Sequence, residues 1–146
     1  MRALLQRVSR AEVSVEGEVV ASIQKGLLLL LGIHRDDGVE LVAPLVKKVA
    51  ELRIFEDEGG KMNRSLLDCR GELLLVSQFT LYANCRGGRR PDFLQAAPPA
   101  QARELYEAFY RECTRLQLPV QRGIFGAEMS ISLVNEGPVT LMLDTL

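Results

Sequence analysis

Two short segments of the chain carry groups that could take part in chemistry. The first, Ser77-Gln78-Phe79-Thr80, directly follows the apolar run Leu73 to Val76. It therefore places two hydroxyls and an amide at the end of a predicted buried strand, where polar groups need partners. A satisfied strand end and a functional site both fit this pattern. Backbone amides at such an end can also stabilise an oxyanion without any ionisable side chain.

The second segment is Asn135-Glu136-Gly137-Pro138, just before the apolar run Val139 to Leu143. Glycine tolerates unusual backbone angles, and proline lacks the amide that a strand ladder uses. A plain tight turn explains the Gly-Pro pair. Because X-Pro bonds adopt cis most readily, the alternative is a rigid cis turn that points two carbonyl oxygens in one direction.

The usual catalytic sequence motifs of hydrolases are missing from the sequence. It has no G-x-S-x-G, Walker, G-x-G-x-x-G or H-E-x-x-H pattern. Nothing in the pattern brings the single histidine, His34, near a serine. The three cysteines, Cys69, Cys85 and Cys113, are widely spaced without a C-x-x-C pair, which indicates reduced thiols. We therefore expect no metal and no cofactor.

Composition and charge restrict the compartment and the partners. The 146 residues are 47% hydrophobic and 25% charged, which fits a single domain spanning residues 1–146. The apolar run from Leu27 is far shorter than the roughly 20 residues that cross a bilayer, and the N-terminus lacks a secretory pattern. We expect a cytoplasmic protein without membrane association. With a net charge of −1, only Arg86 to Arg90 offers a local basic patch, and such a run is more often a solvated turn.

The strands that must position these segments follow from the apolar spacing. Residues 4–23 contain short β-rich runs, with a hairpin turn at Glu16-Gly17-Glu18. Leu27 to Ile33 is apolar on both faces, which is typical of a central strand. The last third again predicts strands, at 120–125, 129–133 and 139–143, and the Asn135 to Pro138 segment joins the last two.

Helical spacing of apolar residues predicts two helices. The first lies between Val39 and Arg53, and Pro44 places its start near Glu40 or later. The second follows Pro98-Pro99 and ends before Pro119. This order does not alternate as a Rossmann fold does, so we predict an α/β fold of mixed β-sheets packed with two main helices, a ββα-type sandwich. Unpaired strand edges favour a dimer.

Five segments of the chain together resemble the bacterial and eukaryotic D-aminoacyl-tRNA deacylase family. They are Glu51 to Asp57, Gly60 to Ser65, Ser77 to Ala83, Gly88 to Pro91 and Asn135 to Thr140. The match runs over essentially the whole chain, and the S-Q-F-T and N-x-G-P-x-T motifs occur in the family's order and approximate spacing. Asn84-Cys85, Gly87 in place of a frequent lysine, and Pro44 depart from the family pattern but leave both motifs intact.

The resemblance implies a homodimeric hydrolase for translation quality control, with its site at the subunit interface. Its substrate would be the 3′ end of aminoacyl-tRNA, where the ester between amino acid and ribose is cleaved. The cis bond between Gly137 and Pro138 of the partner subunit would exclude L-aminoacyl groups. D-aminoacyl esters would fit, and so would glycyl esters mischarged on tRNA-Ala.

The resemblance also assigns roles to individual positions. Arg7 matches the position that braces the Gly-Pro motif, to which Asn135 belongs, and Phe125 and Met129 match positions that contact the terminal adenosine. The catalytic part would be Ser77 to Thr80, with the backbone amides of Phe79 and Thr80 as oxyanion donors.

Thr80 has two candidate roles, and two other functions remain open. As a nucleophile Thr80 would need a base that the sequence does not supply, so we favour a positioning role in which the substrate's 2′-hydroxyl helps to activate water. One alternative function is a non-catalytic RNA-binding dimer that uses Arg86, Arg89 and Arg90 on phosphates. The other is hydrolysis of a small D-amino ester or amide unrelated to tRNA.

Overall fold

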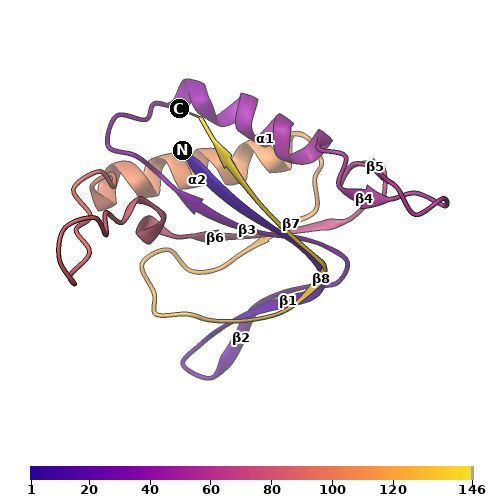
Figure 1. The fold of residues 1–146 in the computed structure, drawn as a ribbon, viewed down its shortest axis with the longest axis horizontal. Coiled ribbons are helices and arrows are strands. Elements are labelled where there is room, and N and C mark those ends of the chain that lie inside the picture. The colour runs from indigo at the N-terminus through magenta and orange to yellow at the C-terminus, as the bar shows by residue number, and fades with distance from the viewer. Residues whose placement is uncertain (146) are drawn as a thin grey trace.

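One mixed sheet and two helices make up most of the computed structural model, which describes residues 1–145 (Figure 1). The strands of the sheet are β1 (Arg2–Val15), β2 (Glu18–Ile23), β3 (Gly26–Gly32), β6 (Glu72–Ser77), β7 (Val120–Arg122) and β8 (Ser130–Asp144). The order is β2-β1-β3-β6-β7, with β8 on β1. β3, β6 and β7 are parallel, and the other pairs are antiparallel. The predicted mixed α/β fold with two main helices is confirmed.

The shorter elements lie between these strands. The helices are α1 (Val42–Glu51) and α2 (Pro99–Arg115), the 3-10 turns are η1 (Val39–Leu41) and η2 (Phe79–Tyr82), and a small ribbon pairs β4 (Phe55–Glu56) with β5 (Met62–Arg64). Pro44 lies in the first turn of α1 and Pro99 is the first residue of α2. Both prolines therefore occupy positions where the helix needs no amide donor, as the sequence predicted.

β3 is buried on both faces, which explains its uninterrupted leucines. Leu27, Leu29 and Leu31 pack with the two helices, whereas Leu28 belongs to a second core on the opposite face. That second core is filled by the β1–β2 hairpin, whose Val13 and other apolar residues fold over β3 and β6. The predicted central strand is thus confirmed, with helices on one side and strands on the other.

β1 is long enough to belong to both layers. β8 runs along one edge of β1, while the other edge pairs with β3 over residues 2–8 and with β2 over residues 11–15. The backbone amide of Ser22 in β2 donates to the Gln121 side-chain oxygen in β7 at 3.0 Å. This contact links the two ends of the strand order, so the sheet is largely closed.

The C-terminal third differs from the prediction in two places. β7 ends at Arg122, and residues 123–129, including Phe125, form a loop rather than strand. Residues 130–144 form one strand instead of two joined by a turn. The reason is the partner strand: Val8 lies opposite Asn135 and Gln6 opposite Thr140, so residues 136–139 bulge out while pairing with β1 continues on both sides.

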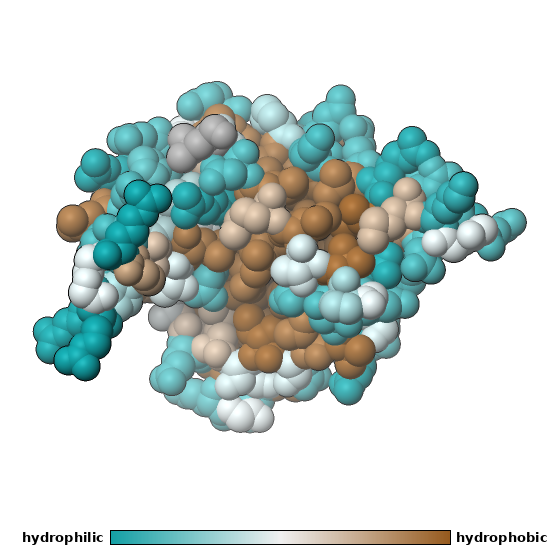
Figure 2. All heavy atoms as spheres, in the orientation of Figure 1, coloured by the Kyte–Doolittle hydropathy of each residue, from teal (hydrophilic) through white to brown (hydrophobic). Residues whose placement is uncertain are grey.

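The free edge of β8 coincides with an apolar surface. No strand among the described residues pairs with the edge of β8 that faces away from β1. Val134, Leu141 and Met142 of β8 are exposed, and Figure 2 shows apolar side chains gathered across the face on which β8 lies in Figure 1. In the described part of the chain, no helix is long and apolar enough to span a membrane.

Candidate functional site

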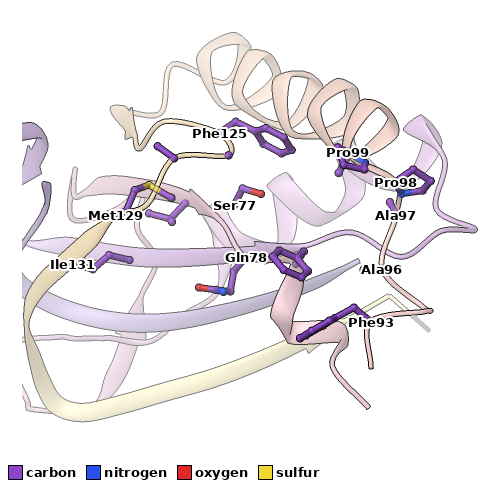
Figure 3. A pocket seen from close by; sticks show the side chains of 15 residues that line it. Ser77, Gln78, Phe93, Ala96, Ala97, Pro98, Pro99, Phe125, Met129 and Ile131 are labelled. Carbon is purple, nitrogen blue, oxygen red and sulfur yellow. The ribbon is translucent and has the colours of Figure 1, made fainter. Parts of the chain in front are cut away.

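A cavity of about 650 Å³ opens at the carboxyl end of β6 (Figure 3). Three segments form its walls: the end of β6 with the start of η2, the segment that leads into α2, and the loop before β8. The lining residues are Val76 to Phe79, Phe93, Ala96 to Pro99, Ala102, Phe125 to Ala127, Met129 and Ile131. None of these described lining residues has an ionisable side chain, and most of the wall is apolar.

Two of the walls are anchored on the end of β3. The backbone amide of Gln78 donates to the Leu31 carbonyl at 2.8 Å, and the amide of Ala97 donates to the Ile33 carbonyl at 2.9 Å. The third wall is tied to β6, because the Gly123 amide donates to the Leu75 carbonyl at 3.0 Å. Hydrogen bonds to the central strands therefore fix the positions of all three walls.

The Ser77 to Thr80 segment turns sharply where the cavity begins. The strand ends at Ser77, and Phe79 starts the 3-10 turn η2, so the chain does not continue as a strand beyond Ser77. The first amides of such a turn have no partner within it. Among the described residues no acceptor is present for the amides of Phe79 and Thr80. The turn thus leaves two adjacent hydrogen-bond donors unused beside the cavity.

The Thr80 side chain is exposed, and its side-chain hydrogen bond is with an uncharged amide. Its Oγ1 accepts a hydrogen bond from Nε2 of Gln78, and Thr80 is not among the residues that line the cavity. A nucleophilic hydroxyl needs a partner that accepts its proton, whereas an amide nitrogen only donates one. This arrangement agrees better with positioning than with nucleophilic attack.

Aromatic side chains frame the cavity. Phe79 and Phe93 meet edge to face with their ring centroids 5.0 Å apart, and both are exposed at the rim. On the opposite wall, the Phe125 ring lies 5.6 Å from that of Tyr106. The Tyr106 hydroxyl donates to the Leu75 carbonyl at 3.3 Å, and burial raises its pKa to about 12. Tyr106 is therefore a structural residue that stays protonated near neutral pH.

Gly137 and Pro138 lie in the β8 bulge, and the peptide bond between them is cis. The buried Arg7 side chain contacts this bulge. Its Nε donates to the Glu136 carbonyl at 3.3 Å, its Nη1 donates to the Ile54 carbonyl at 2.8 Å, and its Nη2 lies 3.8 Å from Glu56 Oε1. Arg7 thus ties the bulge to the β4 region.

Asn135 closes the bulge from within. Its Nδ2 donates to the carbonyls of Arg7 and Val139, both at 3.0 Å, and its Oδ1 accepts from Thr140 Oγ1 at 3.1 Å. Three groups around the bulge are thereby satisfied by one side chain. Gly137 and Pro138 themselves remain exposed.

The residues that the sequence singled out fall into two separate groups in one chain. Ser77, Gln78, Phe79, Phe125 and Met129 line the cavity, with Thr80 beside them. The other group, Arg7, Asn135, Gly137 and Pro138, surrounds the β8 bulge and lines no part of the cavity. The structure of one chain therefore does not bring the two motifs together.

Several wall residues were not predicted as part of a site. Phe93, Ala96 and Ala97 precede α2, and the hydrogen bond between Ala97 and Ile33 holds this segment at the cavity. Only Pro98-Pro99 carried a sequence pattern, and it indicated a helix start. The three cysteines are free, and burial raises the pKa of the Cys113 thiol to about 12.

Comparisons with known proteins agree on one family. The family model described as D-Tyr-tRNA(Tyr) deacylase matches residues 4–144. A D-aminoacyl-tRNA deacylase of Thermosipho africanus is 57% identical, with 99% of this chain and 97% of that protein covered. One from Thermus aquaticus is 54% identical, with 99% and 95% covered.

Solved structures are similar over the full length. One, described as c-Myc DNA Unwinding Element Binding Protein, superposes with a TM-score of 0.94 at 40% identity and covers 100% of this chain and 99% of its own. Another, a probable eukaryotic D-amino acid tRNA deacylase, gives a TM-score of 0.83 at 20% identity with 97% of both chains covered. The second likeness concerns the fold alone.

Proposed function

The chain belongs to the D-Tyr-tRNA(Tyr) deacylase family, hydrolases of the aminoacyl-tRNA ester bond, and we propose that it cleaves this ester in the cavity beside Ser77 to Thr80. The observation that carries the proposal is the pair of unused amides at Phe79 and Thr80, next to a cavity without ionisable lining side chains. Such amides suit the negative charge that develops on the ester oxygen during attack by water.

The proposed mechanism uses main-chain donors and the substrate's own hydroxyl. The amides of Phe79 and Thr80 hold the developing oxyanion, and the ribose 2′-hydroxyl helps to activate the attacking water. Thr80, whose Oγ1 accepts from Gln78, keeps the turn in shape. Ester hydrolysis then releases a free D-amino acid and uncharged tRNA.

Selection against L-amino acids is proposed to come from a second subunit. In the proposed homodimer, Gly137 and Pro138 of the partner subunit enter the cavity and occupy the space of an L side chain. D-aminoacyl groups fit beside this obstacle, and so does glycine, including glycine mischarged on tRNA-Ala. Gly137 and Pro138 are exposed and line no part of the cavity of their own chain, which supports insertion into another chain.

The surface of β8 supports the same homodimer. The free strand edge and the exposed apolar side chains Val134, Leu141 and Met142 lie on the strand that carries the bulge. An unpaired edge and an apolar patch on one surface are features that proteins cover by association. One interface would then both bury the patch and complete the site.

The direct test is release of tyrosine from D-tyrosyl-tRNA and L-tyrosyl-tRNA by the purified protein. We expect the protein to accelerate the release of D-tyrosine. The release of L-tyrosine should remain at the uncatalysed rate. Glycyl-tRNA-Ala should also be hydrolysed, because glycine has no side chain to exclude. Equal release of both tyrosines would contradict the exclusion mechanism, and release of neither would contradict the enzymatic role.

The role of Thr80 predicts a small effect of Thr80→Ala on D-tyrosine release. A neutral hydrogen bond contributes about 0.5–1.5 kcal/mol, so the rate should stay within about tenfold of wild type. Thr80→Ser, which keeps the hydroxyl, serves as the control. If Thr80→Ala abolishes single-turnover release while circular dichroism shows an intact fold, Thr80 is the nucleophile instead.

Nucleic-acid binding without catalysis is the second candidate, favoured by the 40% identical relative described as a DNA unwinding element binding protein. Arg86, Arg89 and Arg90 are exposed in the loop that the Asn84–Asp92 hydrogen bond closes at 3.0 Å. This alternative predicts binding of uncharged tRNA without turnover, weakened steeply by salt. A third candidate, hydrolysis of small D-amino esters, predicts that they turn over as well as charged tRNA does.

A further inference from the structure

Phe125 separates the site cavity from a second cavity of about 270 Å³. The second cavity lies between α2, the end of β7 and the loop that follows it. It is lined by Arg103, Tyr106, Glu107, Arg122 and residues 123–125. Phe125 is the only residue that the two cavities share among the described ones. A ligand longer than one nucleoside could therefore extend from the first cavity past this ring into the second.

The second cavity carries an excess of positive charge. Arg122 Nη1 lies 2.6 Å from Glu107 Oε2, and its guanidinium stacks 3.9 Å from the Tyr110 ring centroid. The Glu107 carboxylate is thereby neutralised by Arg122. Arg103 is the remaining cation, and no carboxylate among the described residues lies within ion-pair distance of it. One guanidinium in this cavity is thus uncompensated.

The Arg103 guanidinium is held in place by the shared aromatic ring. Its central carbon lies 4.6 Å from the Phe125 ring centroid, a cation–π contact. One face of the Arg103 guanidinium is covered by the Phe125 ring. The N–H groups around the edge of the guanidinium remain available for hydrogen bonds. This geometry leaves the planar, bidentate donor set that binds phosphate oxygens best.

We propose that Arg103 binds the 5′-phosphate of the terminal nucleotide when its aminoacyl ester lies in the first cavity. The inference rests on the proposed function. A nucleotide esterified at its 3′ end offers an aminoacyl group, a nucleoside and, on the far side of the ribose, a phosphate. The apolar, aromatic first cavity suits the first two, and the guanidinium behind Phe125 suits the third. Arg103 then acts in substrate binding and does not take part in bond cleavage.

The experiment compares two small substrates that differ only in this phosphate: 3′-O-D-tyrosyl-adenosine and its 5′-monophosphate. For Arg103→Gln we expect kcat/KM on the monophosphate to fall about tenfold, mainly through KM, as for loss of one charge-assisted hydrogen bond. On the nucleoside ester the change should be less than about twofold, because no phosphate is present to be lost. Arg111→Gln is the matched control, since Arg111 is exposed on the same helix and lines neither cavity.

Equal effects of Arg103→Gln on both substrates, or no effect on the monophosphate, would overturn the inference. Calorimetric measurement of the affinities for AMP and adenosine tests the phosphate site without any turnover, and therefore independently of the proposed function. Should wild-type protein hydrolyse neither these esters nor D-tyrosyl-tRNA, the proposed function fails, whereas tighter binding of AMP than of adenosine that disappears in Arg103→Gln still supports the phosphate site. Failure of Arg103→Gln to weaken AMP binding contradicts the site whatever the turnover. With full-length tRNA, the slope of log affinity against log salt should fall by about one.

Discussion

Gly137→Ala should lower the rate of D-tyrosine release by about 100-fold and reduce the preference for D over L. The φ angle of Gly137 is +120°, which L side chains rarely adopt. An added Cβ would lie 2.9 Å from Val139 Cγ2 and 3.1 Å from Arg7 Nη2. Backbone strain of about 1–3 kcal/mol together with these contacts would displace the bulge from the site that it completes in the proposed dimer. A loss of about 2.7 kcal/mol of transition-state stabilisation there corresponds to 100-fold in rate.

Gly17→Ala is the matched control for this substitution. Gly17 also has a positive φ, of +80°, but it lies in the β1–β2 turn and an added Cβ meets no atom within 4 Å. Thermal unfolding should therefore show a loss of stability in both variants, with release of D-tyrosine per folded molecule retained in Gly17→Ala. Wild-type release and wild-type D/L preference in Gly137→Ala would show that the bulge has no part in the site.

Gly26→Ala should destabilise the protein by about 3 kcal/mol or more, the largest effect on folding that we expect from a single methyl group. A Cβ at Gly26 would lie 1.8 Å from the Glu72 carbonyl oxygen and 2.7 Å from the Glu72 backbone nitrogen. Because these atoms are backbone, no side-chain rotation can relieve the overlap. β3 and β6 pair from Gly26 and Glu72 onwards, so the pair that carries Ser77 must separate at one end.

Urea unfolding followed by circular dichroism measures this loss. Gly87→Ala is the control, because an added Cβ at Gly87 meets no atom within 4 Å, and its stability should stay within about 0.5 kcal/mol of wild type. An unchanged unfolding midpoint in Gly26→Ala would mean that β3 and β6 can separate at this end at little cost.

Local sequence patterns were sufficient to predict the elements whose position depends on burial or on a proline. The unbroken leucines of β3 predicted a strand covered on both faces, and the two cores on either side confirm it. Pro44 and Pro99 predicted where the helices begin because each proline restricts the backbone within a few residues of itself. Such information is contained in a short stretch of chain.

The structure of residues 123–144 depends on a distant strand and could not be predicted in the same way. Asn135 to Pro138 looks like a turn locally, but β1 pairs with β8 on both sides of it and makes it a bulge. Pairing of this kind joins residues more than 120 positions apart, such as Val8 with Asn135. Periodicity within a short window contains no such information.

The candidate site shows the same division. The S-Q-F-T segment was recognised from its residues and from the family resemblance, whereas Phe93 and Ala97 reach the cavity only through packing against the end of β3. Arg103 had no pattern of its own in the sequence, since an exposed helical arginine is an ordinary feature. Its contact with Phe125 emerges only in three dimensions.

The absence of ionisable side chains among the described residues of the cavity wall has a practical consequence for how such a protein can be detected. Reagents that label hydrolases by trapping an activated serine or cysteine depend on a base next to the nucleophile. Among the described residues of this wall, Ser77 carries the only hydroxyl, and it has no such base beside it. Covalent profiling of a proteome would therefore overlook a fully working molecule, and a reversible, uncharged ligand shaped like the aminoacyl nucleoside would be the suitable probe.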